Sequence, residues 1–142
     1  MIVLDASVAV KWYFPEPGSD AAIELQGGKH GALVAPELFV VEVTAALVRK
    51  ANMEKARKDD ILILIADFLT SSDDGTIQTR KLSGSAARTA AELAIDIGHP
   101  LKDCIYLVLA MELGCPLVTA DARFAAKARG VWGDVRVLGD AA

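Results

Sequence analysis

Five short runs of apolar and β-branched residues, separated by segments long enough to hold helices, constrain the fold of this chain most strongly. The runs are Ile2–Leu4, Leu33–Ala35, Thr76–Thr79, Leu117–Thr119 and Arg136–Leu138, and the one at Thr76–Thr79 is the weakest. Such runs, bounded by Gly, Pro or Asp, are typical of β-strands. Strands that alternate with helices form a parallel sheet through right-handed crossovers, with helices on both faces. We therefore predict an α/β fold, a three-layer α/β/α sandwich with a central parallel sheet.

Pro, Ser and Gly residues indicate where the helices between these strands begin and end. Proline suits the first turn of a helix, Ser or Asp its N-cap, and glycine the position after its last residue. Ser19 is expected to cap the second helix. The predicted helices are Ser7–Phe14, Ser19 to Leu25 or Gln26, one that follows Pro36 and reaches about Asn52, about Glu54 to Ser71, one that starts after Gly84 and ends at Gly98, Pro100 to Gly114 and Ala122–Arg129.

Length, charge and hydropathy exclude several classes of protein. The 142 residues suit a single domain, predicted to span residues 1–142, and 53% hydrophobic residues provide a core. A net charge of −4 argues against a protein that coats nucleic acid by bulk electrostatics. No charge-free apolar stretch approaches the ~18 residues that span a bilayer, and Asp5 interrupts any signal-like start. We expect a cytoplasmic protein without membrane contact.

Two aspartates directly follow predicted strands and should therefore meet. Asp5 follows the first strand, and Asp121 follows the strand Leu117–Thr119. In an open parallel sheet, ligands bind in the crevice beyond the carboxyl ends of the strands. An aspartate between a strand and a helix is also a good N-cap, and one carboxylate can cap with one oxygen and face the crevice with the other.

Two further acids stand out in predicted helices. Asp103 lies in the first turn of its helix, where a favourable interaction with the helix dipole is the alternative to a functional role. Glu42 lies among apolar residues on every side, and an unpaired buried carboxylate costs several kcal/mol. A basic side chain, a proton or a metal ion must compensate it. Arg49 is too far along the helix for a close pair, so we expect a metal ion.

Four converging acids suit a hard divalent cation with oxygen ligands. Mg²⁺ or Mn²⁺ fits better than zinc, because the sequence has no His/Cys cluster at ligand spacing. His30 and His99 each stand alone in a Gly- or Pro-containing loop and are interpreted as ordinary loop histidines. Cys104 and Cys115 lie in apolar runs and are interpreted as buried free thiols.

The order of these motifs resembles that of PIN-domain ribonucleases, and among them the VapC-type toxins of toxin–antitoxin modules. The resemblance spans almost the whole chain. The matching segments are Ile2–Ser7, Ala35–Leu38 leading to Glu42, His99–Ala110, and Pro116–Asp121 followed by Arg123 and Phe124. One departure is Lys102, where many relatives have an aromatic residue before the acidic one.

The resemblance implies a metal-dependent endoribonuclease that hydrolyses RNA phosphodiester bonds, with Asp5, Glu42, Asp103 and Asp121 as catalytic and metal-binding residues. Mg²⁺, or Mn²⁺, would be held by the three aspartates, while Glu42 either binds the ion or positions the attacking water. Ser7 and Thr119 would orient carboxylates or metal-bound water, although ordinary backbone capping is an alternative for both. The resemblance also implies a homodimer and a cognate antitoxin protein that blocks the site.

An acidic nuclease needs local positive charge to bind RNA. Lys11, Lys102 and Arg123 lie near the acids in sequence and are predicted to contact phosphates without reading base sequence. The five basic residues between Arg49 and Lys58 are instead expected to form a solvated helix face.

Other functions remain as alternatives. A phosphatase of the haloacid dehalogenase type needs a second acid two residues after Asp5, where this chain has Ser7. A response regulator needs paired acids after the first strand and an acceptor aspartate at mid-chain, where Asp67 falls in an apolar helix instead. A PIN-fold module that binds RNA or protein without catalysis would show no metal-dependent cleavage.

The segment Ile61–Leu69 is apolar nearly all around a helix. Such a helix must be covered on more than one side, and an exposed apolar patch marks an interface. We expect this helix to contact a second copy of the chain or the antitoxin. Full burial inside the monomer is the alternative.

Overall fold

Strand β1 (Ile2–Leu4) lies at the centre of a five-stranded sheet in a computed structural model that describes residues 1–139. The last three residues of the predicted domain lie outside this part. The other strands are β2 (Leu33–Pro36), β3 (Ile77–Arg80), β4 (Leu117–Thr119) and β5 (Val135–Val137). They are arranged in the order β3-β2-β1-β4-β5, and every described pair is parallel. This confirms the predicted parallel sheet.

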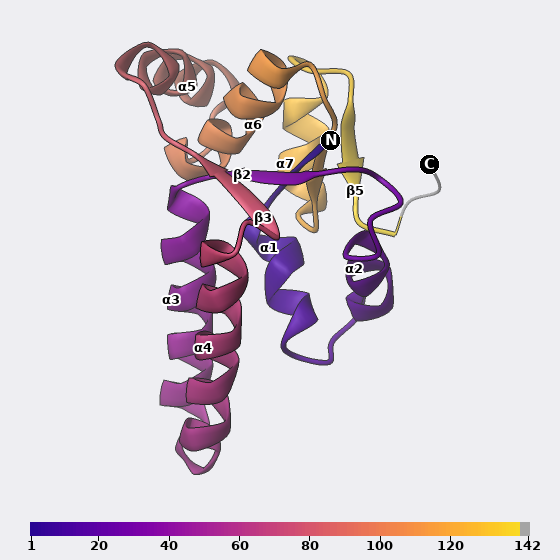
Figure 1. Cartoon of the computed structure of the whole chain (residues 1–142). Helices are drawn as coiled ribbons and strands as arrows, with labels where there is room; N and C mark the ends of the chain where they lie inside the picture. The colour runs from indigo at the N-terminus through magenta and orange to yellow at the C-terminus, as the bar shows by residue number, and fades with distance from the viewer. Residues whose placement is uncertain (140–142) are drawn as a thin grey trace.

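The helices cover both faces of the sheet. They are α1 (Ala6–Ala9), α2 (Ser19–Leu25), α3 (Leu38–Met53), α4 (Lys58–Asp73), α5 (Gly84–Ile97), α6 (Leu101–Leu113) and α7 (Ala122–Ala128). The chain passes from β1 outward to β3 and then returns to β4, so right-handed crossovers place α1 to α4 on one face and α5 to α7 on the other. Figure 1 shows this division, which confirms the three-layer α/β/α architecture.

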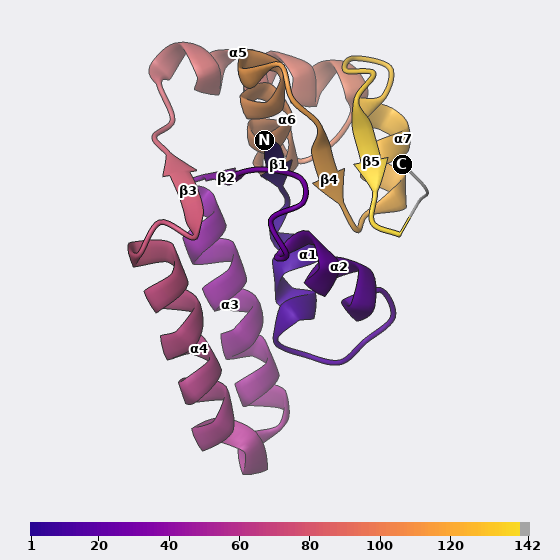
Figure 2. The same ribbon diagram turned by 45° about the vertical axis from the view of Figure 1, so that its right-hand side comes forward.

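The crossover between β2 and β3 forms a long helical hairpin. Helices α3 and α4 lie side by side and extend away from the sheet in both views (Figures 1 and 2). Inside the hairpin, Phe39 and Phe68 pack at a ring-centroid distance of 5.7 Å, and both side chains are fully buried. No helix within residues 1–139 has both the length and the apolar character that crossing a bilayer requires.

Several predicted element boundaries are wrong, and strand β3 begins and ends one residue later than predicted. The expected helix Ser7–Phe14 is only α1 followed by a 3₁₀ turn (Val10–Trp12), and a second 3₁₀ turn (Lys55–Arg57) delays α4 until Lys58. Strand β5 begins and ends one residue earlier than predicted. Ser19 is the first residue of α2 rather than its cap, because its hydroxyl donates to the carbonyl of Phe14.

The order of the strands fixes where a site can form. Strands β1 and β4 are neighbours, although the chain leaves β1 in one direction and returns to β4 from the other. The crevice at the carboxyl ends of such a strand pair is the usual ligand site of an open parallel sheet. Asp5 directly follows β1, and Asp121 follows β4 after Ala120. Both aspartates therefore lie at this edge.

Candidate metal centre

The four acids predicted from the sequence line one cavity of about 210 Å³, together with Ser7 and Arg49. Two come from the carboxyl edge of the sheet. Helix α3 contributes Glu42 from one face of the sheet, and the first turn of α6 contributes Asp103 from the other. The site is therefore assembled from both outer layers and the central sheet.

Asp5 is held by two hydroxyl groups. Ser7 Oγ donates to Asp5 Oδ2 at 2.6 Å, and Thr119 Oγ1 donates to the same oxygen at 2.7 Å. Asp5 occupies the N-cap position of α1 but makes no side-chain capping bond. The capping alternative is therefore wrong for this residue, whose carboxylate is turned toward the neighbouring strand instead.

Burial and neighbouring acids disfavour the ionised form of the Asp5 carboxyl group. Burial is the largest cause that raises the pKa of its carboxyl group, from 3.8 to about 6. The hydrogen bonds from Ser7 and Thr119 lower this pKa, while the charges of Asp103 and Glu42 raise it further. A cation in the cavity would relieve both the repulsion and the desolvation.

The two hydroxyl residues are themselves fixed by the backbone after β4. Ser7 Oγ accepts from the Ala120 N–H at 3.0 Å, and Thr119 Oγ1 accepts from the Asp121 N–H at 3.1 Å. Each hydroxyl thus donates to Asp5 and accepts from the loop that carries Asp121. The position of one aspartate depends on the position of the other.

Asp121 caps helix α7, as the sequence allowed. Its Oδ1 accepts from the backbone N–H groups of Arg123 and Phe124, each at 3.0 Å. A carboxylate has a second oxygen with its own lone pairs. Within residues 1–139, that oxygen, Oδ2, accepts no hydrogen bond, so capping and ion binding are compatible here.

The negative charge of Glu42 is compensated by two side chains of the protein that the sequence analysis did not identify. The Tyr106 hydroxyl donates to Glu42 Oε1 at 2.7 Å, and Lys102 Nζ lies 3.7 Å from Glu42 Oε2. Burial, followed by the bond to Glu42, raises the pKa of Tyr106, which keeps its proton and remains a donor. Both partners belong to α6, so spacing along α3 could not reveal them.

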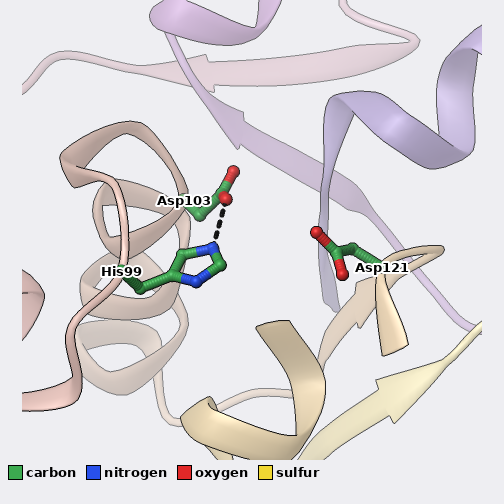
Figure 3. Close-up of side chains that lie close together, drawn as sticks. All are labelled: His99, Asp103 and Asp121. Carbon is green, nitrogen blue, oxygen red and sulfur yellow. Dashed lines mark hydrogen bonds and ion pairs between the residues drawn. The ribbon is translucent and has the colours of Figure 1, made fainter. Parts of the chain in front are cut away.

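His99 is a site residue that the sequence analysis missed. Its Nε2 lies 2.6 Å from Asp103 Oδ2, and the ring stacks on Phe124 with centroids 4.8 Å apart. Ligand atoms of His99, Asp103 and Asp121 all lie within 4.8 Å of one another. Figure 3 shows the imidazole bonded to Asp103, with Asp121 facing both. The i, i+4 spacing of His99 and Asp103 was the available signal.

The three basic residues predicted to contact phosphates have different surroundings in the structure. Lys11 Nζ donates to the carbonyl of Pro17 at 2.8 Å and pairs with Glu16, so its charge stabilises a loop. Lys102 pairs with Glu42, and Arg123 is exposed beside Asp121. None of these three lines the cavity, whereas Arg49 does. In the predicted solvated run, Lys50 and Arg57 lie over the Phe14 ring.

The donor set fits a hard divalent cation. Carboxylate oxygens are the preferred ligands of Mg²⁺ and Mn²⁺, and one oxygen of each aspartate is held by a donor of the protein. Asp5, Asp103 and Asp121 would hold the ion, with Glu42 beside them. Both cysteines are buried free thiols and, among the described residues, do not line the cavity.

Comparison with known proteins identifies the family of this chain. A family model of the PIN domain matches residues 2–130. Ribonuclease VapC12 of Mycobacterium tuberculosis is 30% identical over 125 residues, which is 88% of this chain and 90% of the relative. This chain therefore belongs to the PIN-domain family, among its VapC-type members.

Solved structures share the fold at low sequence identity. VapC20 of Mycobacterium tuberculosis, a toxin that cleaves the sarcin–ricin loop, aligns with a TM-score of 0.68 at 14% identity, covering 89% of this chain and 94% of that one. A toxin–antitoxin complex from Klebsiella pneumoniae aligns with a TM-score of 0.62 at 14% identity and covers 95% of each chain.

Proposed function

We propose that this chain is an Mg²⁺- or Mn²⁺-dependent endoribonuclease and acts as the toxin of a toxin–antitoxin pair. The observation that carries the proposal is the cavity at the β1/β4 edge, lined by Asp5, Glu42, Asp103 and Asp121. The similarity to a ribonuclease over 88% of the chain supports RNA as the substrate. A bound divalent cation lowers the pKa of coordinated water and stabilises negative charge on the phosphate.

The residues of the chain then have separate tasks. The three aspartates would hold the cation, and Ser7 and Thr119 orient Asp5 through its Oδ2. Glu42, fixed by Tyr106, accepts a proton from the attacking water or adds to the ion site. Arg49 faces the same cavity and is the best placed cation for a substrate phosphate.

Cleavage of a defined RNA tests the proposal directly. Purified protein should cut RNA in Mg²⁺ or Mn²⁺, lose the activity in EDTA, and regain it when the cation is restored in excess. Asp134→Asn is a matched control, because this acid pairs with Arg136 away from the cavity and should leave the rate unchanged. Cleavage that persists in EDTA, or no cleavage of any RNA, would favour a metal-independent or non-catalytic PIN module.

A second part of the proposal concerns the surface of α4. Ile61 and Phe68 are fully buried, whereas Leu62 and Ile63 are 51% and 61% exposed. The monomer thus leaves part of this apolar helix uncovered, as an interface requires. The toxin–antitoxin complex that shares the fold supports an antitoxin partner, and we propose that the exposed side of α4 contacts either the antitoxin or a second copy of the chain.

Substitutions on the exposed and the buried side of α4 distinguish a role in the proposed interface from a role in the core. Ile63→Asp should stay folded yet weaken assembly at least about tenfold, because a charge in a dry interface is poorly compensated. Ile61→Asp places the same charge in the core and should unfold the protein. Circular dichroism monitors folding, and light scattering and antitoxin pull-down monitor assembly. Wild-type assembly by folded Ile63→Asp protein would place the interface elsewhere.

A further inference from the structure

His99 lies where three helices meet. Gly98 ends α5 with a φ of 64°, a conformation that glycine adopts without strain, and the His99 N–H then donates to the Ala94 carbonyl at 3.0 Å. From α7, Lys127 Nζ donates to the Gly98 carbonyl at 2.8 Å. The backbone of His99 is therefore fixed at the end of α5, immediately before α6 begins.

The imidazole is fixed as firmly as the backbone. The side chain is only 10% exposed, and its ring stacks on Phe124 with an interplanar angle of 25°. Phe124 belongs to α7, and its N–H is capped by Asp121. The ring therefore spans the gap between the helix that carries Asp103 and the helix that Asp121 caps, as Figure 3 shows.

The direction of the hydrogen bond follows from chemistry. An ionised carboxylate can only accept, so the ring nitrogen Nε2 must carry the hydrogen that it shares with Asp103 Oδ2. This bond occupies one oxygen of Asp103 and leaves the other for an ion in the cavity. It also occupies Nε2, which would have to break this bond before it could bind a metal itself.

From this geometry we infer that His99 is a positioning residue, which orients Asp103 for the divalent cation and sets its separation from Asp121 without binding the cation itself. The inference rests on the proposed metal dependence and names a role that the acidic residues alone do not provide. Donors that hold a metal-binding side chain typically change metal affinity by about 10- to 100-fold when they are removed.

Substitutions at His99 separate the hydrogen bond from the ring stack. His99→Phe retains an aromatic ring against Phe124 but has no donor, whereas His99→Gln retains an N–H donor without the ring. His99→Leu has neither, and because Leu and Gln are similar in size, their difference reports the donor alone even if the Phe variant fails to fold. His30→Phe is the matched control, since His30 lies on an exposed loop.

Mn²⁺ binding is measured without RNA, from the loss of the free-ion electron paramagnetic resonance signal as protein is added. We expect His99→Phe and His99→Leu to bind Mn²⁺ about tenfold more weakly than the wild type, His99→Gln to recover most of that loss, and His30→Phe to match the wild type. Circular dichroism checks that each variant is folded.

Four outcomes would overturn the inference. The donor has no role if the wild type and His99→Leu bind Mn²⁺ equally well, or if His99→Leu and His99→Gln lose the same Mn²⁺ affinity. The proposed function stands in both cases. A ¹⁴N coupling from His99 in pulsed spectra of the Mn²⁺-loaded protein makes the residue a direct ligand. Absence of Mn²⁺ binding by the wild type overturns the proposed metal dependence and this role together.

Discussion

Asp5→Asn is expected to lower the rate of RNA cleavage by about two orders of magnitude or more, because a bound cation contributes several kcal/mol of transition-state stabilisation. The substitution keeps the size of the side chain and removes its charge. The Ser7 and Thr119 hydroxyls can rotate to suit the amide, so the fold should persist. Cleavage of a defined RNA at saturating Mg²⁺ measures the effect.

Asp103→Asn and Asp121→Asn should behave in the same way, since both acids line the same cavity. The double variant should lose little more than either single variant, because residues that act as one unit are not additive. Circular dichroism spectra must match the wild type for the comparison to hold. Cleavage at the wild-type rate by folded Asp5→Asn protein would contradict the proposed site.

Removing the cation should make the wild type lose stability as the pH rises. Burial raises the pKa of Asp5 to about 6 in the folded chain, above the 3.8 of an unfolded one, so the folded state binds this proton more tightly. Its contribution to stability is present at low pH and is lost as the pH rises through about 6. The full shift corresponds to about 3 kcal/mol, of which about 1.4 kcal/mol falls between pH 5 and pH 8.

Denaturant unfolding in EDTA measures this effect, with Asp5→Asn as the reference that cancels all other titrating groups. The free energy of unfolding of the wild type should fall relative to the variant between pH 5 and pH 8. At pH 8, a cation at 100 times its Kd should restore about 2.7 kcal/mol to the wild type and much less to the variant. Parallel pH profiles of the two proteins would show that Asp5 does not have a raised pKa.

The sheet and the four acids could be predicted because their signals are local. Short β-branched runs mark the strands, and Asp5 and Asp121 stand at strand ends, where parallel topology brings them together. The partners of Glu42 could not be predicted, because Tyr106 and Lys102 approach from a helix on the other face of the sheet. That contact depends on how α3 and α6 pack, which periodicity along one helix does not encode.

His99 shows a different limit of the sequence. A lone histidine between Gly98 and Pro100 is indistinguishable from a loop histidine until α7 places Phe124 against its ring. Lys11 illustrates the same limit, because its position near an acid in sequence does not reveal that its ammonium group donates to the carbonyl of Pro17. Position in the sequence identified the cavity-lining acids only where a strand or a helix determined which way the side chain points.

The position of β1 between β2 and β4 also has a consequence for synthesis of the chain. Asp5 is translated 116 positions before its partner Asp121, which follows the neighbouring strand β4. At about 5 to 20 residues per second, translation of that interval takes roughly 6 to 23 s. Throughout this time the nascent chain lacks part of the cavity, so the proposed cleavage cannot take place there before Asp121 has been made.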